Sequence, residues 1–119
     1  MKISCPGKII LMGEHGVVYG KPAIVAAVNR RMTVIFNEKN QTSEIKSDIP
    51  IGCGMGSSAA LTVIRAAMHV STRKKINEMA YEQEKINHGD PSGVDNTICT
   101  YGGILWYQKS KERSVFKKL

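Results

Sequence analysis

The chain has 119 residues, enough for one compact domain and too few for two. Its hydrophobic fraction of 42% fits a globular core and excludes wholesale disorder. Lys and Arg outnumber Asp and Glu by 17 to 10, and this net charge of +7 suits anionic partners, although a solvated surface with a basic tail explains most of it.

The first half of the chain predicts β-structure, because β-branched and apolar runs alternate with polar turns. The strand-like segments are residues 2–12, interrupted at Pro6-Gly7, and residues 23–28, 31–37 and 44–49. A turn-rich stretch with three glycines follows the first of them, and residues 38–44 predict a hairpin loop.

The second half predicts helices. Residues 57–70 are apolar nearly all round, which is typical of a buried helix. Thr72 can cap a second helix over residues 72–87. Its apolar stripe consists of Ile76, Met79, Ala80, Gln83 and Ile86.

A turn at residues 89–93, a short helix to Tyr101 and a strand over 104–108 complete the pattern. Strands and helices without regular alternation predict the α+β class, with a small sheet packed on a helix hairpin. His69, on the first helix, belongs to no motif and is expected to be structural.

Cys5, Cys53 and Cys99 are far apart and odd in number, and predict neither a disulfide framework nor a zinc site. No apolar run is long enough to span a membrane, and the first residues do not form a signal peptide. We therefore expect a cytoplasmic protein without a membrane partner.

The segment PIGCGMGSSAA, residues 50–60, carries the strongest chemical signal. Its three alternate glycines bring backbone N–H groups close to an anion, and the following helix directs its positive end to the same place. Two serines add hydroxyls for a phosphate or a magnesium ion. No Gly-Lys-Ser/Thr follows, so this is not a Walker A loop. Taken alone, the segment also fits a glycine-rich connection with an ordinary serine cap.

Two further segments flank this loop in order: PGKIILMGEHGVVYG, residues 6–20, and EKINHGDPSGVDN, residues 84–96. Together the three resemble the GHMP kinases, a family of small-molecule kinases, and most of all its mevalonate kinase branch. The resemblance covers residues 3–108. It implies that residues 1–119 form the family's N-terminal ATP-binding domain, with a ribosomal-protein-like fold, internally shortened and with the C-terminal domain absent.

The resemblance implies transfer of the ATP γ-phosphate to the hydroxyl of mevalonate, in isoprenoid precursor synthesis. Asp95 would be the catalytic base, and Lys8 would keep its carboxylate ionised and stabilise charge near the phosphate. Ser58 and Glu84 would bind Mg²⁺. Glu14 and His15 would line the substrate side. The residues implied to bind the ATP phosphates are Gly52, Gly54, Met55, Gly56, Ser57, Ser58 and Ser92.

One argument for the magnesium pair is independent of the family. Ser58 and Glu84 each lie 12 residues from the link between the two helices, at 70 and 72 respectively, so an antiparallel hairpin places them at the same height. Glu84 falls about 80° around the helix from Ile76, which puts it at the margin of the apolar stripe.

Alternatives stay open. The chain could be another GHMP kinase acting on phosphomevalonate, homoserine or a sugar, or a non-catalytic nucleotide- or anion-binding remnant. A complementing C-terminal domain or a homodimer would supply the rest of an acceptor pocket. A basic nucleic-acid binder is the third reading, but aromatic and basic residues are not interleaved, so nucleic acid is not the expected partner.

Overall fold

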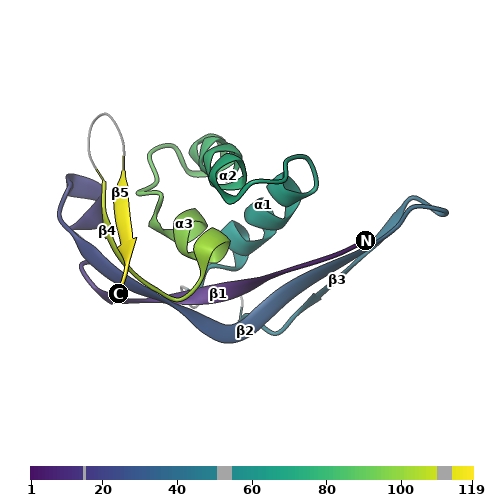
Figure 1. Cartoon of the computed structure of the whole chain (residues 1–119), viewed down its shortest axis with the longest axis horizontal. Helices are drawn as coiled ribbons and strands as arrows, with labels where there is room; N and C mark the ends of the chain where they lie inside the picture. The colour runs from purple at the N-terminus through teal and green to yellow at the C-terminus, as the bar shows by residue number, and fades with distance from the viewer. Residues whose placement is uncertain (15, 51–54, 110–113) are drawn as a thin grey trace.

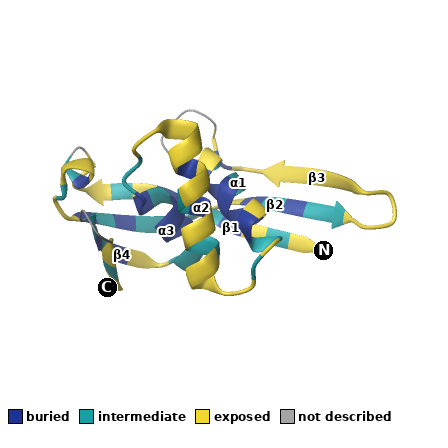
Figure 2. Cartoon of the chain, turned by 90° about the horizontal axis from the view of Figure 1, so that it is seen from above, coloured by how far each residue is buried: buried dark blue, intermediate teal, exposed yellow. Residues whose placement is uncertain are grey.

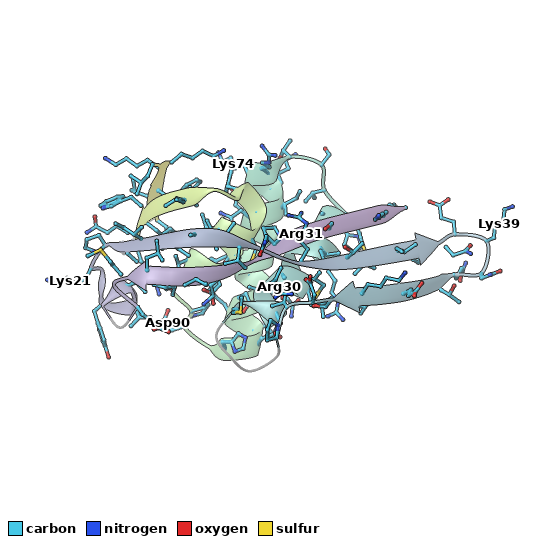
Figure 3. All side chains as sticks on the ribbon, turned by 90° about the horizontal axis from the view of Figure 1, so that it is seen from below. Lys21, Arg30, Arg31, Lys39, Lys74 and Asp90 are labelled. Atoms are coloured by element: carbon cyan, nitrogen blue, oxygen red, sulfur yellow. The ribbon has the colours of Figure 1, made fainter. Side chains whose placement is uncertain are left out.

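The computed structural model describes residues 1–14, 16–50, 55–109 and 114–119. A curved sheet forms one layer, and helices cover one of its faces (Figure 1). Figure 3 shows the molecule from the opposite, uncovered side of the sheet, with Arg30 and Arg31 on the central strand. The α+β class and the small sheet packed on a helix hairpin are therefore confirmed.

The sheet is antiparallel throughout the described residues. Its strands are β1 (Lys2–Met12), β2 (Ala23–Asn37), β3 (Thr42–Ser47), β4 (Ile104–Gln108) and β5 (Val115–Lys118). Strand β2 is central: β1 pairs along one edge, while β3 and β4 share the other edge. The segments predicted as two strands, 23–28 and 31–37, form this single strand, because nothing between them breaks an extended backbone.

A register shift in β1 sets up the site. It lies between Pro6 and Lys8 and places both Gly7 and Lys8 on the covered side of the sheet. A Cβ atom on Gly7 would stand 2.8 Å from the Met55 carbonyl oxygen, so only glycine permits this approach. The backbone N–H of Lys8 donates to that same oxygen at 2.9 Å. The end of the glycine loop is thereby fixed against β1.

Three α-helices lie in the described part of the chain: α1 (Ser57–Ala67), α2 (Arg73–His88) and α3 (Val94–Tyr101), besides a short 3₁₀ turn, η1 (Val17–Tyr19). Helices α1 and α3 pack on the sheet, and α2 packs on both from outside (Figures 1 and 2). Helix α1 ends three residues before the predicted residue 70. The Thr72 hydroxyl accepts from the Lys75 N–H, which confirms the predicted cap of α2.

The predicted stripe of α2 was partly wrong. Ala80 and Glu84 are its buried residues, with Ile76, Asn77 and Tyr81 half-buried beside them. Met79, Gln83 and Ile86 are exposed. Helix α2 is the outer layer and touches other helices over a narrow face, so hydrophobicity alone does not select that face. Glu84 therefore lies within the packed face and not at its margin.

Strand β5 was not predicted, because its lysines resemble a solvated tail. Phe116 packs on Tyr101 with ring centroids 4.7 Å apart, and the Lys117 ammonium lies 5.3 Å from the centre of the Trp106 ring. In the part of the chain that the structure describes, no helix is long and apolar enough to cross a membrane.

Two isoleucines on different helices test the packing. Ile98 of α3 is fully buried, whereas Ile86 of α2 is 78% exposed. We expect Ile98→Ala to lower the free energy of unfolding by about 2–5 kcal/mol, because it leaves a cavity between α3 and the sheet. The matched change Ile86→Ala should stay within about 0.5 kcal/mol of the wild type. Urea unfolding followed by circular dichroism measures both; equal losses would contradict the described packing.

Candidate functional site

A pocket of about 360 Å³ lies where the start of α1, the end of α2 and the start of α3 meet. Its lining includes the sequence-predicted residues Met55, Gly56, Ser57, Ser58, Glu84, Ser92 and Asp95. A larger groove of about 1160 Å³ lies across the 90–93 turn and includes none of the predicted residues. We place the site in the smaller pocket because it gathers the chemically competent side chains.

Lys8 and Asp95 form an ion pair at the side of this pocket. The Lys8 Nζ atom lies 3.1 Å from Asp95 Oδ1, and the side chains are 7% and 44% exposed. The contact is ionic, because Asp95 Oδ1 has no hydrogen-bond partner of good geometry among the described residues. Burying the ammonium is costly without a counter-charge, so the pair ties β1 to the first turn of α3. Asp95 keeps an exposed side facing the pocket.

The glycine loop reaches the pocket through Gly56, the residue before α1. Its φ of +80° lies in the left-handed region that favours glycine, and a Cβ there would stand 3.0 Å from Lys8 Cγ. No side chain caps this end of α1 in the described residues. The first-turn N–H groups therefore remain open to an anion in the pocket, which Ser57 and Ser58 also line.

Helix α2 contributes Glu84, which is only 5% exposed. Its Oε2 atom lies 3.1 Å from His88 Nε2, and that nitrogen lies 3.5 Å from Ser58 Oγ. The other oxygen, Oε1, is buried without a hydrogen-bond partner among the described residues. A buried, unsatisfied carboxylate oxygen of a residue that lines the same pocket as Ser58 fits a hard cation such as Mg²⁺.

The described residues hold no group of three His, Cys, Asp or Glu side chains suited to a metal.

Not every predicted residue is brought to the pocket. Glu14 lies in the exposed turn after β1 and does not line it. Gly52, Gly54 and His15 lie outside the described residues. His88 was not predicted as a site residue, although its position four residues after Glu84 on one helix was a usable signal.

Two of the cysteines meet beneath the ion pair, in β1 and α3. Cys5 and Cys99 are both free and buried. A hydrogen bond with Cys5, together with burial, raises the pKa of the Cys99 thiol well above its usual value. The thiol therefore stays protonated and behaves as a small apolar core residue.

Several known proteins resemble this chain in sequence. Residues 20–103 match the model of a protein family described as "GHMP kinases N terminal domain". The chain is 31% identical to a mevalonate kinase of Thermococcus sibiricus and 33% identical to one of Archaeoglobus fulgidus. These alignments cover 94% and 98% of this chain but 53% and 56% of the relatives. The chain thus spans about half the length of the curated relatives it matches.

Solved structures show the same relationship. The crystal structure of a mevalonate kinase from Methanococcus jannaschii superposes with a TM-score of 0.81 at 25% identity, covering 100% of this chain and 55% of that one. A mevalonate kinase of L. major, solved in complex with R-mevalonate, gives a TM-score of 0.75 at 26% identity, covering 99% and 52%.

Substitutions at Gly20 and Gly56, two glycines with left-handed backbone conformation, test whether the close packing of Lys8 at Gly56 shapes an anion site. Gly20→Ala accepts a similar backbone strain, but its Cβ meets only the Lys109 carbonyl oxygen at an ordinary 3.5 Å. Gly56→Ala must also displace Lys8. Using inorganic tripolyphosphate with Mg²⁺, we expect a clear rise in melting temperature for the wild type and for Gly20→Ala, and little or none for Gly56→Ala. Equal rises in all three would show that the anion binds elsewhere.

Proposed function

This chain belongs to the GHMP kinase family, and on that premise we propose that it transfers the γ-phosphate of ATP to the hydroxyl of mevalonate. The observation that carries the proposal is the pairing of Lys8 with Asp95 at 3.1 Å, beside a pocket that also holds Gly56, Ser58 and Glu84. Phosphoryl transfer to a hydroxyl requires a proton acceptor, a positively charged group and a site for the phosphate anion. These three features lie in or beside one pocket.

In this mechanism Asp95 accepts the proton of the acceptor hydroxyl on its open, pocket-facing side. Lys8 holds the carboxylate in place and carries positive charge where negative charge develops. Because Lys8 is buried, its ammonium is paired with Asp95 and its backbone N–H is bonded to the Met55 carbonyl oxygen, little reorganisation is needed when charge moves.

The phosphates of ATP would be held by the N–H groups at the start of α1 and by the hydroxyls of Ser57, Ser58 and Ser92, with Gly52 and Gly54 preceding them in the loop. Ser58 and Glu84 would hold Mg²⁺. The bound ion supplies neutralisation of phosphate charge. His88 keeps one Glu84 oxygen engaged, which leaves Oε1 for the ion.

Mevalonate is favoured as acceptor by the names of the relatives, one of which was solved with R-mevalonate. Glu14 and His15 are proposed on the acceptor side. A C-terminal domain or a second copy of the chain would complete that side, since this chain spans only about half the length of the relatives. The free thiols of Cys5 and Cys99 support a reducing, cytoplasmic location.

A second candidate is a nucleotide-binding module without turnover. It is favoured by one observation: the described pocket gathers residues for phosphate and metal, whereas Glu14 stands apart from it.

The base is tested by Asp95→Asn, which keeps size and hydrogen bonding but removes the proton acceptor. For a working kinase we expect turnover of mevalonate to fall roughly 10²–10⁴-fold while Mg-ATP affinity is retained. A coupled ADP-release assay with mevalonate, homoserine and galactose measures the first, and calorimetry the second. Wild-type Mg-ATP binding with no turnover of any acceptor would favour the binding module. An equal turnover in both proteins would remove Asp95 as the base.

The cation site is tested by Glu84→Gln against Glu82→Gln, a neighbouring exposed carboxylate outside the pocket. We expect ATP to raise the melting temperature of the wild type and of Glu82→Gln more strongly with Mg²⁺ than with EDTA. Glu84→Gln should lose this difference, because an amide is a poor substitute for a charged ligand. A retained difference would place the ion elsewhere.

A further inference from the structure

We propose that Tyr107 of β4 and Lys109, which follows it, are positioning residues for phosphoryl transfer. They hold the turn at residues 90–92, which carries Ser92 and leads directly into Asp95. The inference rests on the proposed function, because the turn matters for activity only if this pocket is the active site. Neither residue lines the pocket itself.

The Tyr107 hydroxyl is the first anchor. It donates to the Ser92 carbonyl oxygen at 2.6 Å and lies 2.7 Å from Ser114 Oγ. The residue is 1% exposed, and burial raises the pKa of the phenol to about 12, so the hydroxyl remains a donor across the physiological range. A Cβ on Gly93 would stand 2.5 Å from this oxygen, so glycine is needed for the approach.

Lys109 is the second anchor. Its ammonium lies 2.8 Å from Asp90 Oδ1 and donates to the Pro91 carbonyl oxygen at 3.0 Å. The side chain is 16% exposed, in contrast to its 87% exposed partner. The hydrogen bond and charge of Lys109 lower the pKa of Asp90. An ion pair with so exposed a partner adds little stability, so the main effect of Lys109 is to fix where the Pro91 carbonyl lies.

The position of the turn decides the position of the proposed catalytic groups. Ser92 faces the pocket and its Oγ accepts from the Val94 N–H at 3.2 Å, which starts α3 one residue before Asp95. Thr97 Oγ1 donates to the Gly93 carbonyl oxygen at 2.6 Å, so the turn and the first turn of α3 move together. A shift of the 90–92 backbone would therefore displace Ser92 and Asp95 relative to Lys8.

Such a shift matters because phosphoryl transfer depends chiefly on positioning, where a displacement of about 1 Å costs up to roughly 100-fold in rate. Lys8 is held separately, on β1. The alignment of the Lys8–Asp95 pair thus depends on Tyr107 of β4 and on Lys109 after it, as well as on the helix hairpin.

The experiment compares the wild type, Lys109→Met, Tyr107→Phe and the control Lys74→Met. Lys74 lines the same groove as Lys109 but lies at the other end of α2 from Asp90 (Figure 3), so its loss removes equal charge without touching the turn. Lys109→Arg serves as rescue, because a guanidinium can donate to both partners.

Mg-ATP affinity is measured by calorimetry at 0.5 M salt, which screens the effect of net charge. Amide exchange of residues 92–95 is measured by NMR without nucleotide.

We expect Lys109→Met and Tyr107→Phe to accelerate exchange of the Val94 amide, about tenfold or more for Tyr107→Phe, which leaves a buried carbonyl without its donor. Both should weaken Mg-ATP several-fold, while Lys74→Met and Lys109→Arg remain near the wild type. If Tyr107→Phe does not fold, Lys109→Met alone decides the question.

Wild-type exchange and affinity in both test variants would overturn the proposal. Faster exchange with unchanged affinity would overturn it too, because the two residues would then be structural only. If the wild type itself does not bind Mg-ATP, the proposed function fails instead, and the exchange rates still show whether these residues hold the turn.

Discussion

The site depends on one constraint, that the buried ammonium of Lys8 needs a counter-charge. A charged group with 7% exposure is stable only when paired, and Asp95 is its partner at 3.1 Å. Several local features serve this contact. The register shift at Gly7 turns Lys8 toward the helices, the missing side chain of Gly56 leaves room for its stem, and the turn at 90–92 starts α3 at the required place.

A second energetically unfavourable burial occurs at Glu84, which also lines the pocket. Glu84 is buried with one oxygen engaged by His88 and the other unsatisfied among the described residues. Burying such an atom lowers stability, and native proteins retain it mainly where function requires it. The pocket is therefore lined by Asp95, the partner of a buried ammonium, and by Glu84, an incompletely neutralised carboxylate. That polarity suits a ligand that carries both phosphate and a metal ion.

Much of this arrangement was predictable from local sequence. The strand content of the first half, the helix hairpin, the cap at Thr72 and the start of a helix directly after Gly56 follow from periodicity and turn chemistry, and the structure confirms them. Other features were not predictable. The single strand β2, the strand β5 and the buried face of α2 depend on neighbours far away in the chain, as the exposure of Met79 and Ile86 illustrates.

By itself, the sequence determined which chemical groups are available and in what order: three motifs that carry a lysine, a histidine, glycines, serines, glutamates and an aspartate as candidate site residues. Only the tertiary structure decided which of them meet. It joined Lys8 to Asp95, placed His88 between Ser58 and Glu84, left Glu14 outside the described pocket and recruited Tyr107 and Lys109 to the 90–92 turn. The physical reason is that hydrophobic periodicity specifies faces of helices and strands, whereas distances between charged groups depend on how those faces stack.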